Sequence, residues 1–323
     1  MAIKTVNTLL NQGLASVETY LESLVTSDVQ TLYDASQHIL TSGGKRVRPQ
    51  VVLLSYLAAG GQDVEKAIPL ATAVETLHTA TLVHDDINDH SDTRRGKVSV
   101  HSKWGRTFAL LTGDYLFAKV YELMAPFGSP YNEIMSNASV RLVEGETLQA
   151  LAAKSGEMDR ETYKKVISRK TASLFEAAAH MGAQLGGADE AQIEALADYG
   201  YNLGLTFQIV DDILDIIGDP EKLGKPVGTD VAQKRGVMMT QNGVLAVADV
   251  EASGVAAPAQ AVLEDDPVQQ MLSSLRESGA VEIARAQAYE VANRARAALD
   301  QLPESEAREL LYELVDLVMD RDK

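Results

Sequence analysis

Apolar residues recur at helical spacing along almost the whole chain. In residues 4–24, Val6, Leu10, Leu14, Val17 and Leu21 follow one another at intervals of three or four residues. This spacing places them on one face of an amphipathic helix. The same period predicts a helix around residues 32–40 and further helices over residues 50–59, 63–89, 106–125, 130–153, 160–185, 191–217, 268–277, 279–300 and 303–320.

The helical period predicts an all-α protein with ten or more helices. No run of alternating apolar and polar residues is long enough for a strand of useful length. Many amphipathic helices bury their apolar faces by packing together as a bundle, so we expect residues 1–323 to form a single domain. Residues 236–267 break the pattern, and Gly254, Pro258 and Pro267 predict a loop or hinge there rather than a domain boundary.

The composition narrows the range of partners. The chain has 29 Lys and Arg residues against 46 Asp and Glu residues, which gives a formal net charge of −17. A field of this sign does not favour nucleic acid or an anionic membrane surface. Cysteine is absent, which fits a reducing compartment, and we find neither a secretion signal nor a bilayer-spanning apolar run. We therefore expect a soluble, cytoplasmic protein without a transmembrane segment.

The first acidic cluster, Asp85, Asp86 and Asp89, ends the helix predicted over residues 63–89. On a helix, Asp85 and Asp89 share a face, and Asp86 lies about 100° round from them. Like charges at this spacing destabilise a helix by roughly 0.2–0.5 kcal/mol, which a bound cation would offset. Carboxylate oxygens without cysteine or clustered histidine suit a hard ion, Mg²⁺ before Zn²⁺. Taken alone, the cluster is equally compatible with a solvated helix end.

A second cluster of the same form stands far downstream. Asp211, Asp212 and Asp215 end the helix predicted over residues 191–217, and Asp211 follows Asp85 by 126 residues. If the two helices face each other, six carboxylates meet at one mouth of the bundle. Because Mg²⁺ held by carboxylates commonly also binds substrate phosphates, the two clusters together predict a site for a magnesium-bound diphosphate.

Basic residues complete the predicted site. In an acidic chain, cations in glycine-rich turns or beside aspartates are the candidates for binding phosphate. They are Lys45, Arg48, Arg94, Arg95, Lys170 and Lys225. Each of them alone is also explained as an ordinary surface ion pair, but jointly they favour a diphosphate site.

These residues belong to an ordered set of motifs over roughly residues 30–235. The set resembles the trans-isoprenyl diphosphate synthases, and among them the medium- and long-chain polyprenyl diphosphate synthases such as octaprenyl and solanesyl diphosphate synthases. It consists of GGKRVRP at residues 43–49, the first aspartate cluster with Arg94-Arg95-Gly96, Glu144-Gly145-Glu146 with Gln149, Lys170-Thr171, Gln208 with the second aspartate cluster, and GKPVGTD at residues 224–230.

The resemblance implies the isoprenoid synthase fold, an orthogonal helical bundle around a central cavity, and a homodimer. It also implies three Mg²⁺ per active site, with Asp85, Asp89 and Asp211 as ligands and Asp86, Asp212 and Asp215 lining the same site. Isopentenyl diphosphate would be bound by Lys45, Arg48, His78 and Arg95. The allylic diphosphate would be bound by Arg94, Lys170, Thr171, Gln208 and Lys225.

The reaction that the resemblance implies is 1′-4 trans chain elongation. The C–O bond of an allylic diphosphate breaks, the double bond of isopentenyl diphosphate attacks the allylic C1, and a proton leaves C2 with the departing pyrophosphate as base. Magnesium and cationic side chains stabilise the leaving group. The predicted catalytic residues are Asp85, Asp86, Asp89, Asp211, Asp212 and Lys170. The resemblance does not decide which allylic diphosphate is the first substrate: dimethylallyl, geranyl, farnesyl or geranylgeranyl diphosphate.

The helix that precedes the first aspartate cluster bears on product length. Thr81, Leu77 and Val74 lie on the face of Asp85, with Ala80 close by. In short-chain members of the family, the positions of Ala80 and Thr81 tend to be aromatic. The small residues here, on a face about 16 Å long, predict a product of about C30–C50. The alternative is that Ala80 and Thr81 only allow close packing against a neighbouring helix.

The chain departs from the family pattern after Asp230. Lys234 and Arg235 stand where one lysine is usual, so both are candidate diphosphate ligands, and residues 236–267 are the least similar part. Other functions stay open beside a long-chain synthase: a shorter product such as geranylgeranyl or farnesyl diphosphate, or a class I terpene cyclase. A non-catalytic partner subunit is least favoured, because both aspartate clusters are complete. Transient membrane contact for product release also stays open.

Overall fold

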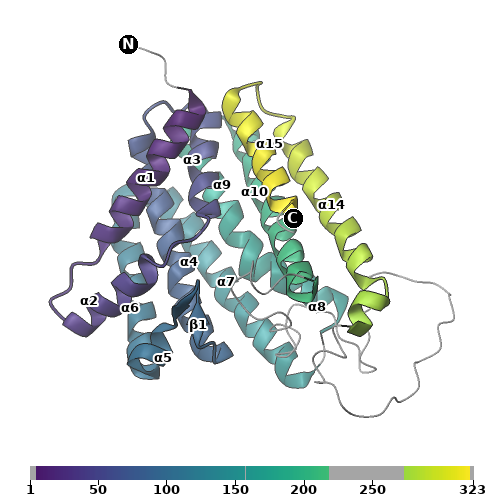
Figure 1. Ribbon diagram of the computed structural model, residues 1–323. Coiled ribbons are helices and arrows are strands. Elements are labelled where there is room, and N and C mark those ends of the chain that lie inside the picture. The colour runs from purple at the N-terminus through teal and green to yellow at the C-terminus, as the bar shows by residue number, and fades with distance from the viewer. Residues whose placement is uncertain (1–4, 157, 218–272, 321–323) are drawn as a thin grey trace.

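A computed structural model of the protein describes residues 5–156, 158–217 and 273–320, and helices dominate this part of the chain (Figure 1). Its twelve α-helices confirm the prediction of an all-α protein with ten or more helices. The first elements are α1 (Val6–Leu24), α2 (Gln30–Leu40), α3 (Val47–Ala58), η1 (Val64–Ala67), α4 (Ile68–Asp89), β1 (Thr93–Arg94), β2 (Lys97–Val98), α5 (Val100–Trp104), α6 (Arg106–Met124) and η2 (Ala125–Phe127). The later elements are α7 (Ser129–Ser155), α8 (Arg160–Ile167), η3 (Ser168–Ala172), α9 (Ser173–Gly186), α10 (Glu190–Ile217), α14 (Ala280–Leu299) and α15 (Glu306–Met319).

Helices α9 and α10 lie in the middle of the molecule, between the N-terminal helices and the pair α14 and α15 (Figure 1). Helix α9 packs against both α3 and α10. Glycines allow these helices to approach closely. A Cβ atom on Gly182 of α9 would lie 2.4 Å from the carbonyl oxygen of Val52, and one on Gly200 of α10 would lie 2.5 Å from that of Phe175. The largest cluster of buried apolar side chains includes residues from α1 through α15.

The chain between α4 and α5 contains a short antiparallel strand pair that the hydrophobic pattern did not predict. Thr93 pairs with Val98, and Arg94 pairs with Lys97. Two residues per strand are too few to show an alternating pattern. The pair reverses the chain at Arg95 and Gly96, shortly after the first aspartate cluster, and Arg94 and Arg95 contact α4 at Asp86 and Glu75, respectively.

The helix predicted over residues 160–185 is interrupted by a π-helical segment, η3. This segment contains Lys170 and Thr171, and π-helical turns are rare and often occur at functional sites. Two glycines hold it closely between helices. A Cβ atom on Gly145 of α7 would lie 2.3 Å from the backbone nitrogen of Lys170, and one on Gly204 of α10 would lie 2.7 Å from the Cα atom of Ala172. The position of Lys170 is therefore set by backbone contacts on two sides.

Several sequence predictions fall outside the described residues. They concern Lys225, Lys234, Arg235 and the irregular residues 236–267. The organisation of residues 1–323 as one domain stays a prediction. Of the helix predicted over residues 268–277, residues 273–277 are described, and they are helical. None of the helices in the described residues has the length and apolar character that crossing a membrane requires.

Replacing Gly145 with a larger residue is expected to destabilise the protein, because the backbone of η3 leaves no room for a side chain. Gly145→Val should lower the free energy of unfolding by about 2 kcal/mol or more, as overpacking does elsewhere. The measurement is urea denaturation followed by circular dichroism at fixed protein concentration. Ala150→Val, at an exposed position of the same helix, is the control and should cost less than about 1 kcal/mol. Equal costs for the two variants would contradict the close packing.

Candidate active site

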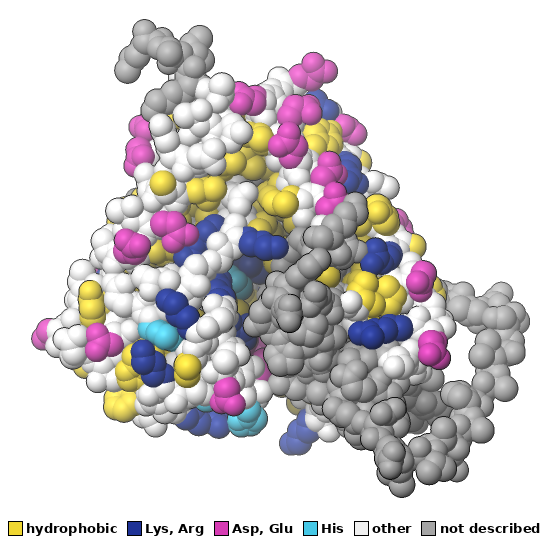
Figure 2. Space-filling view, viewed as in Figure 1, with side chains coloured by type: hydrophobic (Ala, Val, Ile, Leu, Met, Phe, Trp, Pro, Cys, Tyr) yellow, Lys and Arg dark blue, Asp and Glu magenta, His cyan; other side chains and the backbone are white. Residues whose placement is uncertain are grey.

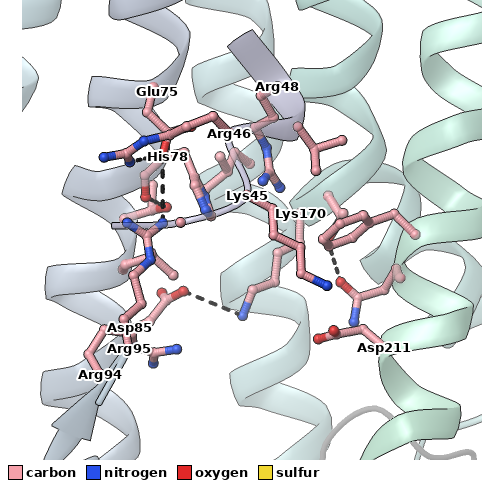
Figure 3. Close-up of a pocket in the computed structure, with 18 of the residues that line it drawn as sticks. Lys45, Arg46, Arg48, Glu75, His78, Asp85, Arg94, Arg95, Lys170 and Asp211 are labelled. Carbon is pink, nitrogen blue, oxygen red and sulfur yellow. Dashed lines mark hydrogen bonds and ion pairs between the residues drawn. The ribbon is translucent and has the colours of Figure 1, made fainter. Parts of the chain in front are cut away.

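A cavity of about 640 Å³ opens between α4 on one side and η3 and α10 on the other. Its wall also includes the loop before α3 and the strand pair after α4 (Figure 3). Each predicted diphosphate-binding residue that the structure describes lines this cavity: Lys45, Arg48, His78, Arg94, Arg95, Lys170, Thr171 and Gln208. These residues come from five segments that are far apart in the sequence, and the fold brings them to one place.

Lys and Arg side chains gather in the middle of the face that Figure 2 shows, while Asp and Glu side chains lie mostly toward its edges. The local charge thus has the opposite sign to the formal net charge of −17. A concave surface with this sign attracts anions.

The two aspartate clusters contribute one residue each to the cavity wall. Asp85 and Asp211 lie on opposite sides of the cavity, and Lys45 and Lys170 reach in between them (Figure 3). Asp86 and Asp212 are buried and turn toward protein partners. The six carboxylates do not form one compact cluster here. Within the described part of the chain, no three acidic or histidine side chains are close enough to hold a metal ion.

Asp86 is held by the arginine of the strand pair. The Nε atom of Arg94 donates a hydrogen bond of 2.8 Å to Oδ1 of Asp86. The Oδ2 atom of Asp86 is buried and accepts no hydrogen bond from any residue that the structure describes. Burial raises the pKa of Asp86, although the contact with Arg94 opposes this shift. One oxygen of this carboxylate therefore lacks a donor or cation.

Lys170 is the centre of a second set of contacts. Its Nζ atom lies 3.9 Å from Oδ2 of Asp85 and forms an ion pair with Glu146 of α7. It also donates a hydrogen bond of 2.7 Å to Oε1 of Gln149. Burial raises the pKa of Asp85 to about 7, and the charges of Glu146 and Asp89 add to this shift while Lys170 opposes it. Lys170 therefore offsets only part of the effect that burial and the neighbouring carboxylates have on the pKa of Asp85.

A chain of hydrogen bonds fixes the wall formed by η3 and α10. The hydroxyl of Thr171 donates to Oε1 of Gln208 at 2.7 Å, and the amide of Gln208 donates to Oδ1 of Asp212 at 2.8 Å. The phenol of Tyr163 donates to the other oxygen of Asp212 at 2.6 Å. Tyr163 was not predicted as a site residue, and its role here is to orient a carboxylate of the second aspartate cluster.

Arg48 and His78 are held in different ways. The guanidinium carbon of Arg48 lies 4.5 Å from the ring centre of Phe175 and 5.8 Å from that of Phe207, which keeps a buried cation over aromatic faces. Burial, together with the positive charges of Arg48 and three neighbouring arginines, lowers the pKa of His78 well below its usual value. His78 is therefore a neutral hydrogen-bonding group at neutral pH.

Sequence reasoning missed two charged residues in the cavity wall, Arg46 and Glu75. Arg46 lies between the predicted ligands Lys45 and Arg48 in the sequence, and the motif alone gives no reason to assign it a different role. Glu75 is the one acidic residue in the apolar stretch of residues 68–83. A lone carboxylate on an otherwise buried helix requires a buried partner, and this signal could have identified Glu75.

The residues predicted to set product length lie on α4, between Val74 and Thr81. Thr81 lines the cavity, and its hydroxyl donates to the carbonyl oxygen of His78 at 2.8 Å. Ala80, Leu77 and Val74 are buried within the main apolar cluster. A tunnel along this face and close packing against a neighbouring helix both stay open.

Comparisons with known proteins agree with the motifs. A family model described as polyprenyl synthetase matches residues 29–248. The chain is 36% identical over 323 residues to heptaprenyl diphosphate synthase component 2 of Geobacillus stearothermophilus, and the match covers all of both chains. It is also 36% identical over 306 residues to a short chain isoprenyl diphosphate synthase of Methanothermobacter thermautotrophicus, covering 93% of this chain and 94% of that one.

A solved structure extends the comparison to the fold. The crystal structure of a polyprenyl synthase from Caulobacter crescentus, complexed with calcium and isoprenyl diphosphate, aligns over all of both chains with a TM-score of 0.85 and 34% identity. Similarity of this extent, in sequence and in structure, confirms the isoprenoid synthase fold and the family that the motifs predict. The chain belongs to the polyprenyl synthetase family, the trans-isoprenyl diphosphate synthases, and is a prenyltransferase.

Proposed function

We propose that this chain elongates an allylic diphosphate with isopentenyl diphosphate by 1′-4 trans condensation and releases pyrophosphate. The observation that carries the proposal is the cavity in which cations from three chain segments, the start of α3, the strand pair and η3, lie around Asp85 and Asp211. A cavity with this charge fits two diphosphates, one for each substrate. We assign isopentenyl diphosphate to the end with Arg48, His78 and Arg95, and the allylic diphosphate to the end with Lys170.

The aspartates of α4 and α10 are the proposed metal ligands. Asp85, Asp89 and Asp211 would hold Mg²⁺, with Asp86, Asp212 and Asp215 lining the same site. Three ions per site follow from the resemblance to the family. The Oδ2 atom of Asp86, which has no hydrogen-bond partner among the described residues, and the raised pKa of Asp85 support a site that a cation completes. When bound, Mg²⁺ supplies Lewis acidity that stabilises the charge on the leaving pyrophosphate.

The protein side chains position both substrates for the reaction. Lys170 and Arg94 neutralise charge that develops on the allylic diphosphate as the C–O bond breaks. Neutral His78 offers hydrogen bonds to isopentenyl diphosphate. The double bond then attacks the allylic C1, and the proton that leaves C2 is taken up by the departing pyrophosphate. No side-chain nucleophile takes part, and water must be kept out because it would trap the allylic cation.

We propose a product of about C30–C50, because the α4 face from Asp85 to Val74 is about 16 Å long and carries small residues near its top. Thr81 in the cavity wall supports this proposal. The two relatives described above have names that differ in chain length, one heptaprenyl and one short chain. A geranylgeranyl or farnesyl product from the same chemistry is therefore the alternative.

We propose that two copies of this chain form a homodimer through α6 and α7. In the described residues, seven of the 13 large apolar side chains that are exposed lie on these two helices: Phe108, Leu110, Leu111, Tyr121, Val140, Val143 and Leu151. Such a concentration of exposed apolar area is typical of an interface. The name of one relative, component 2, describes that protein as part of a larger assembly, so a heteromer is the alternative. A cytoplasmic location stays a prediction.

The proposed reaction is tested by incubating the purified chain with farnesyl diphosphate and Mg²⁺, with and without isopentenyl diphosphate. Longer prenyl diphosphates should form only when both substrates are present, and a chelator should abolish turnover until Mg²⁺ is restored. Asp85→Asn should lower turnover by about 100-fold or more, because it removes a metal ligand. Thin-layer chromatography of radiolabelled products is the measurement.

The same experiment separates the other functions. A product formed from farnesyl diphosphate alone would indicate a terpene cyclase. No turnover by the chain alone, followed by turnover after a second subunit is added, would indicate a non-catalytic or heteromeric component.

Product length is tested with bulky residues at the top of the proposed tunnel. Ala80→Phe and Thr81→Phe should shorten the main product, because an aromatic ring would block the growing prenyl tail. Thr81→Val, which keeps the volume of the side chain, is the matched control and should leave the product length unchanged. Chromatography of dephosphorylated products gives the lengths. If neither phenylalanine shortens the product, the tunnel does not run along this face.

The homodimer is tested with a charge on the proposed interface. Leu111→Glu should shift the mass measured by light scattering after gel filtration from two chains to one, because a buried unpaired carboxylate opposes association. Tyr289→Glu, at an exposed apolar position on α14, is the control and should leave the mass unchanged. A wild-type protein that is already monomeric would contradict the proposal.

A further inference from the structure

Glu75 places a buried negative charge in the wall of a cavity that is otherwise rich in cations. Its side chain is 3% exposed, and its Oε1 atom lies 2.6 Å from Nη1 of Arg46 and 3.6 Å from Nη2 of Arg95. In a site for diphosphate, a carboxylate opposes the charge of the ligand. Its presence among the cations therefore requires a role other than attraction of substrate.

The backbone of both arginine partners is strained. Three non-glycine residues in the described part of the chain have positive φ: Arg46 at 48°, His90 at 52° and Arg95 at 51°. Such a conformation is unfavourable outside glycine, and it persists where the surroundings determine it, often at functional sites. Two of the three are the residues that direct their guanidiniums to Glu75.

Arg46 is fully engaged by protein oxygens. Its Nε atom lies 2.5 Å from Oε1 of Glu18, and its Nη2 atom donates to Oε2 of Glu18 and to the carbonyl oxygen of Leu40, each at 3.0 Å. With Nη1 on Glu75, Arg46 joins α1 to α4. It also fixes the chain between two predicted ligands, Lys45 in the loop before α3 and Arg48 in the first turn of α3. Arg46 is therefore a fixed point of this loop rather than a ligand.

Arg95 is held less tightly than Arg46. Its contact with Glu75 is 3.6 Å long, and the side chain is 19% exposed at the cavity. Its Nη1 atom donates to the carbonyl oxygen of Gly43, so Arg95 also touches the loop before α3. Oxygen atoms of Glu75 and Gly43 thus orient the guanidinium of Arg95, while part of its side chain stays exposed in the cavity, where a ligand can contact it.

We propose that Glu75 is a positioning residue for isopentenyl diphosphate: it holds Arg95 directly, and Lys45 and Arg48 through Arg46, in the arrangement that receives the diphosphate. This inference rests on the proposed function for the identity of the ligand. The contacts join α1, the loop that leads into α3, α4 and the strand pair. Lys45, Arg48, His78 and Arg95, which the resemblance assigns to this substrate, lie in that loop, at the start of α3, on α4 and in the strand pair, respectively. Glu75 lies with Arg46 above Asp85 in the view of Figure 3, away from the allylic end.

Two physical effects of removing this charge have opposite signs. Loss of a carboxylate beside an anion site strengthens binding of an anion if attraction alone decides. Loss of the group that fixes the arginines weakens binding, because the ligand must then order them itself. Positioning therefore predicts the opposite result from simple electrostatics.

The experiment compares Glu75→Gln with the wild-type full chain. Isopentenyl diphosphate alone cannot react, so its binding is measured directly by isothermal titration calorimetry. Glu75→Gln should bind it about ten-fold more weakly or worse, with a matching rise in KM for isopentenyl diphosphate. The KM for farnesyl diphosphate should change less than about two-fold, because Lys170 and Arg94 do not contact Glu75.

Two further variants refine the result. Glu75→Asp keeps the charge but is one methylene shorter, so it should also weaken binding, which a pure charge effect would not produce. Glu18→Gln removes the same charge from the other partner of Arg46 and leaves both contacts of Glu75 in place, so its effect should be smaller. Glu75→Asp also serves if Glu75→Gln does not fold, as judged by circular dichroism.

The outcomes that overturn the proposal are distinct from failure of the proposed function. If the wild type binds isopentenyl diphosphate and Glu75→Gln binds it equally or more tightly, Glu75 has no positioning role. Equal loss of affinity for both substrates would show general damage and would also overturn it. If the wild type itself binds no isopentenyl diphosphate, the proposed function is wrong.

Discussion

Burial of like and unlike charges in one small cavity is the constraint on which the site depends. The Nζ atom of Lys170 is surrounded by oxygen atoms of Asp85, Glu146 and Gln149, which come from two other helices. An ammonium group whose side chain is only 23% exposed requires such partners. To bring them together, the backbone around Lys170 adopts a π-helical turn that α7 approaches through Gly145. The π-helical turn, the close approach of α7 and the contacts of Lys170 therefore occur at one place in the fold.

The same constraint divides the aspartates into two groups. Asp85 and Asp211 face the cavity, while Asp86 and Asp212 are buried against Arg94 and Tyr163, respectively. Neighbouring carboxylates on a helix point about 100° apart, so a single cluster can serve both the cavity and the packing behind it. The inner aspartates fix the ends of α4 and α10, and the outer ones remain for ligand contacts.

The helical period and the ordered motifs predicted most of the fold and of the cavity wall. Lys45 and Arg48 could be identified because they stand in a glycine turn of an acidic chain. Two features could not be predicted in this way. A π-helical turn has the same apolar pattern as the α-helix around it, so η3 left no mark in the sequence. The contact of Glu75 with Arg46 is the second: a lone carboxylate in an apolar helix indicates a buried partner, but only the tertiary fold shows that this partner is Arg46, 29 residues earlier.

The contacts of Arg46 span 28 and 29 residues, to Glu18 and Glu75, whereas Asp211 lies 126 residues beyond Asp85. The entropy of loop closure rises with the number of residues enclosed, and a chain is synthesised from its N-terminus. Glu18, Arg46 and Glu75, which form the arginine–glutamate network, have therefore all been synthesised before α9 and α10 are translated. One end of the cavity is a local product of the first hundred residues, and the opposite wall must be assembled onto it.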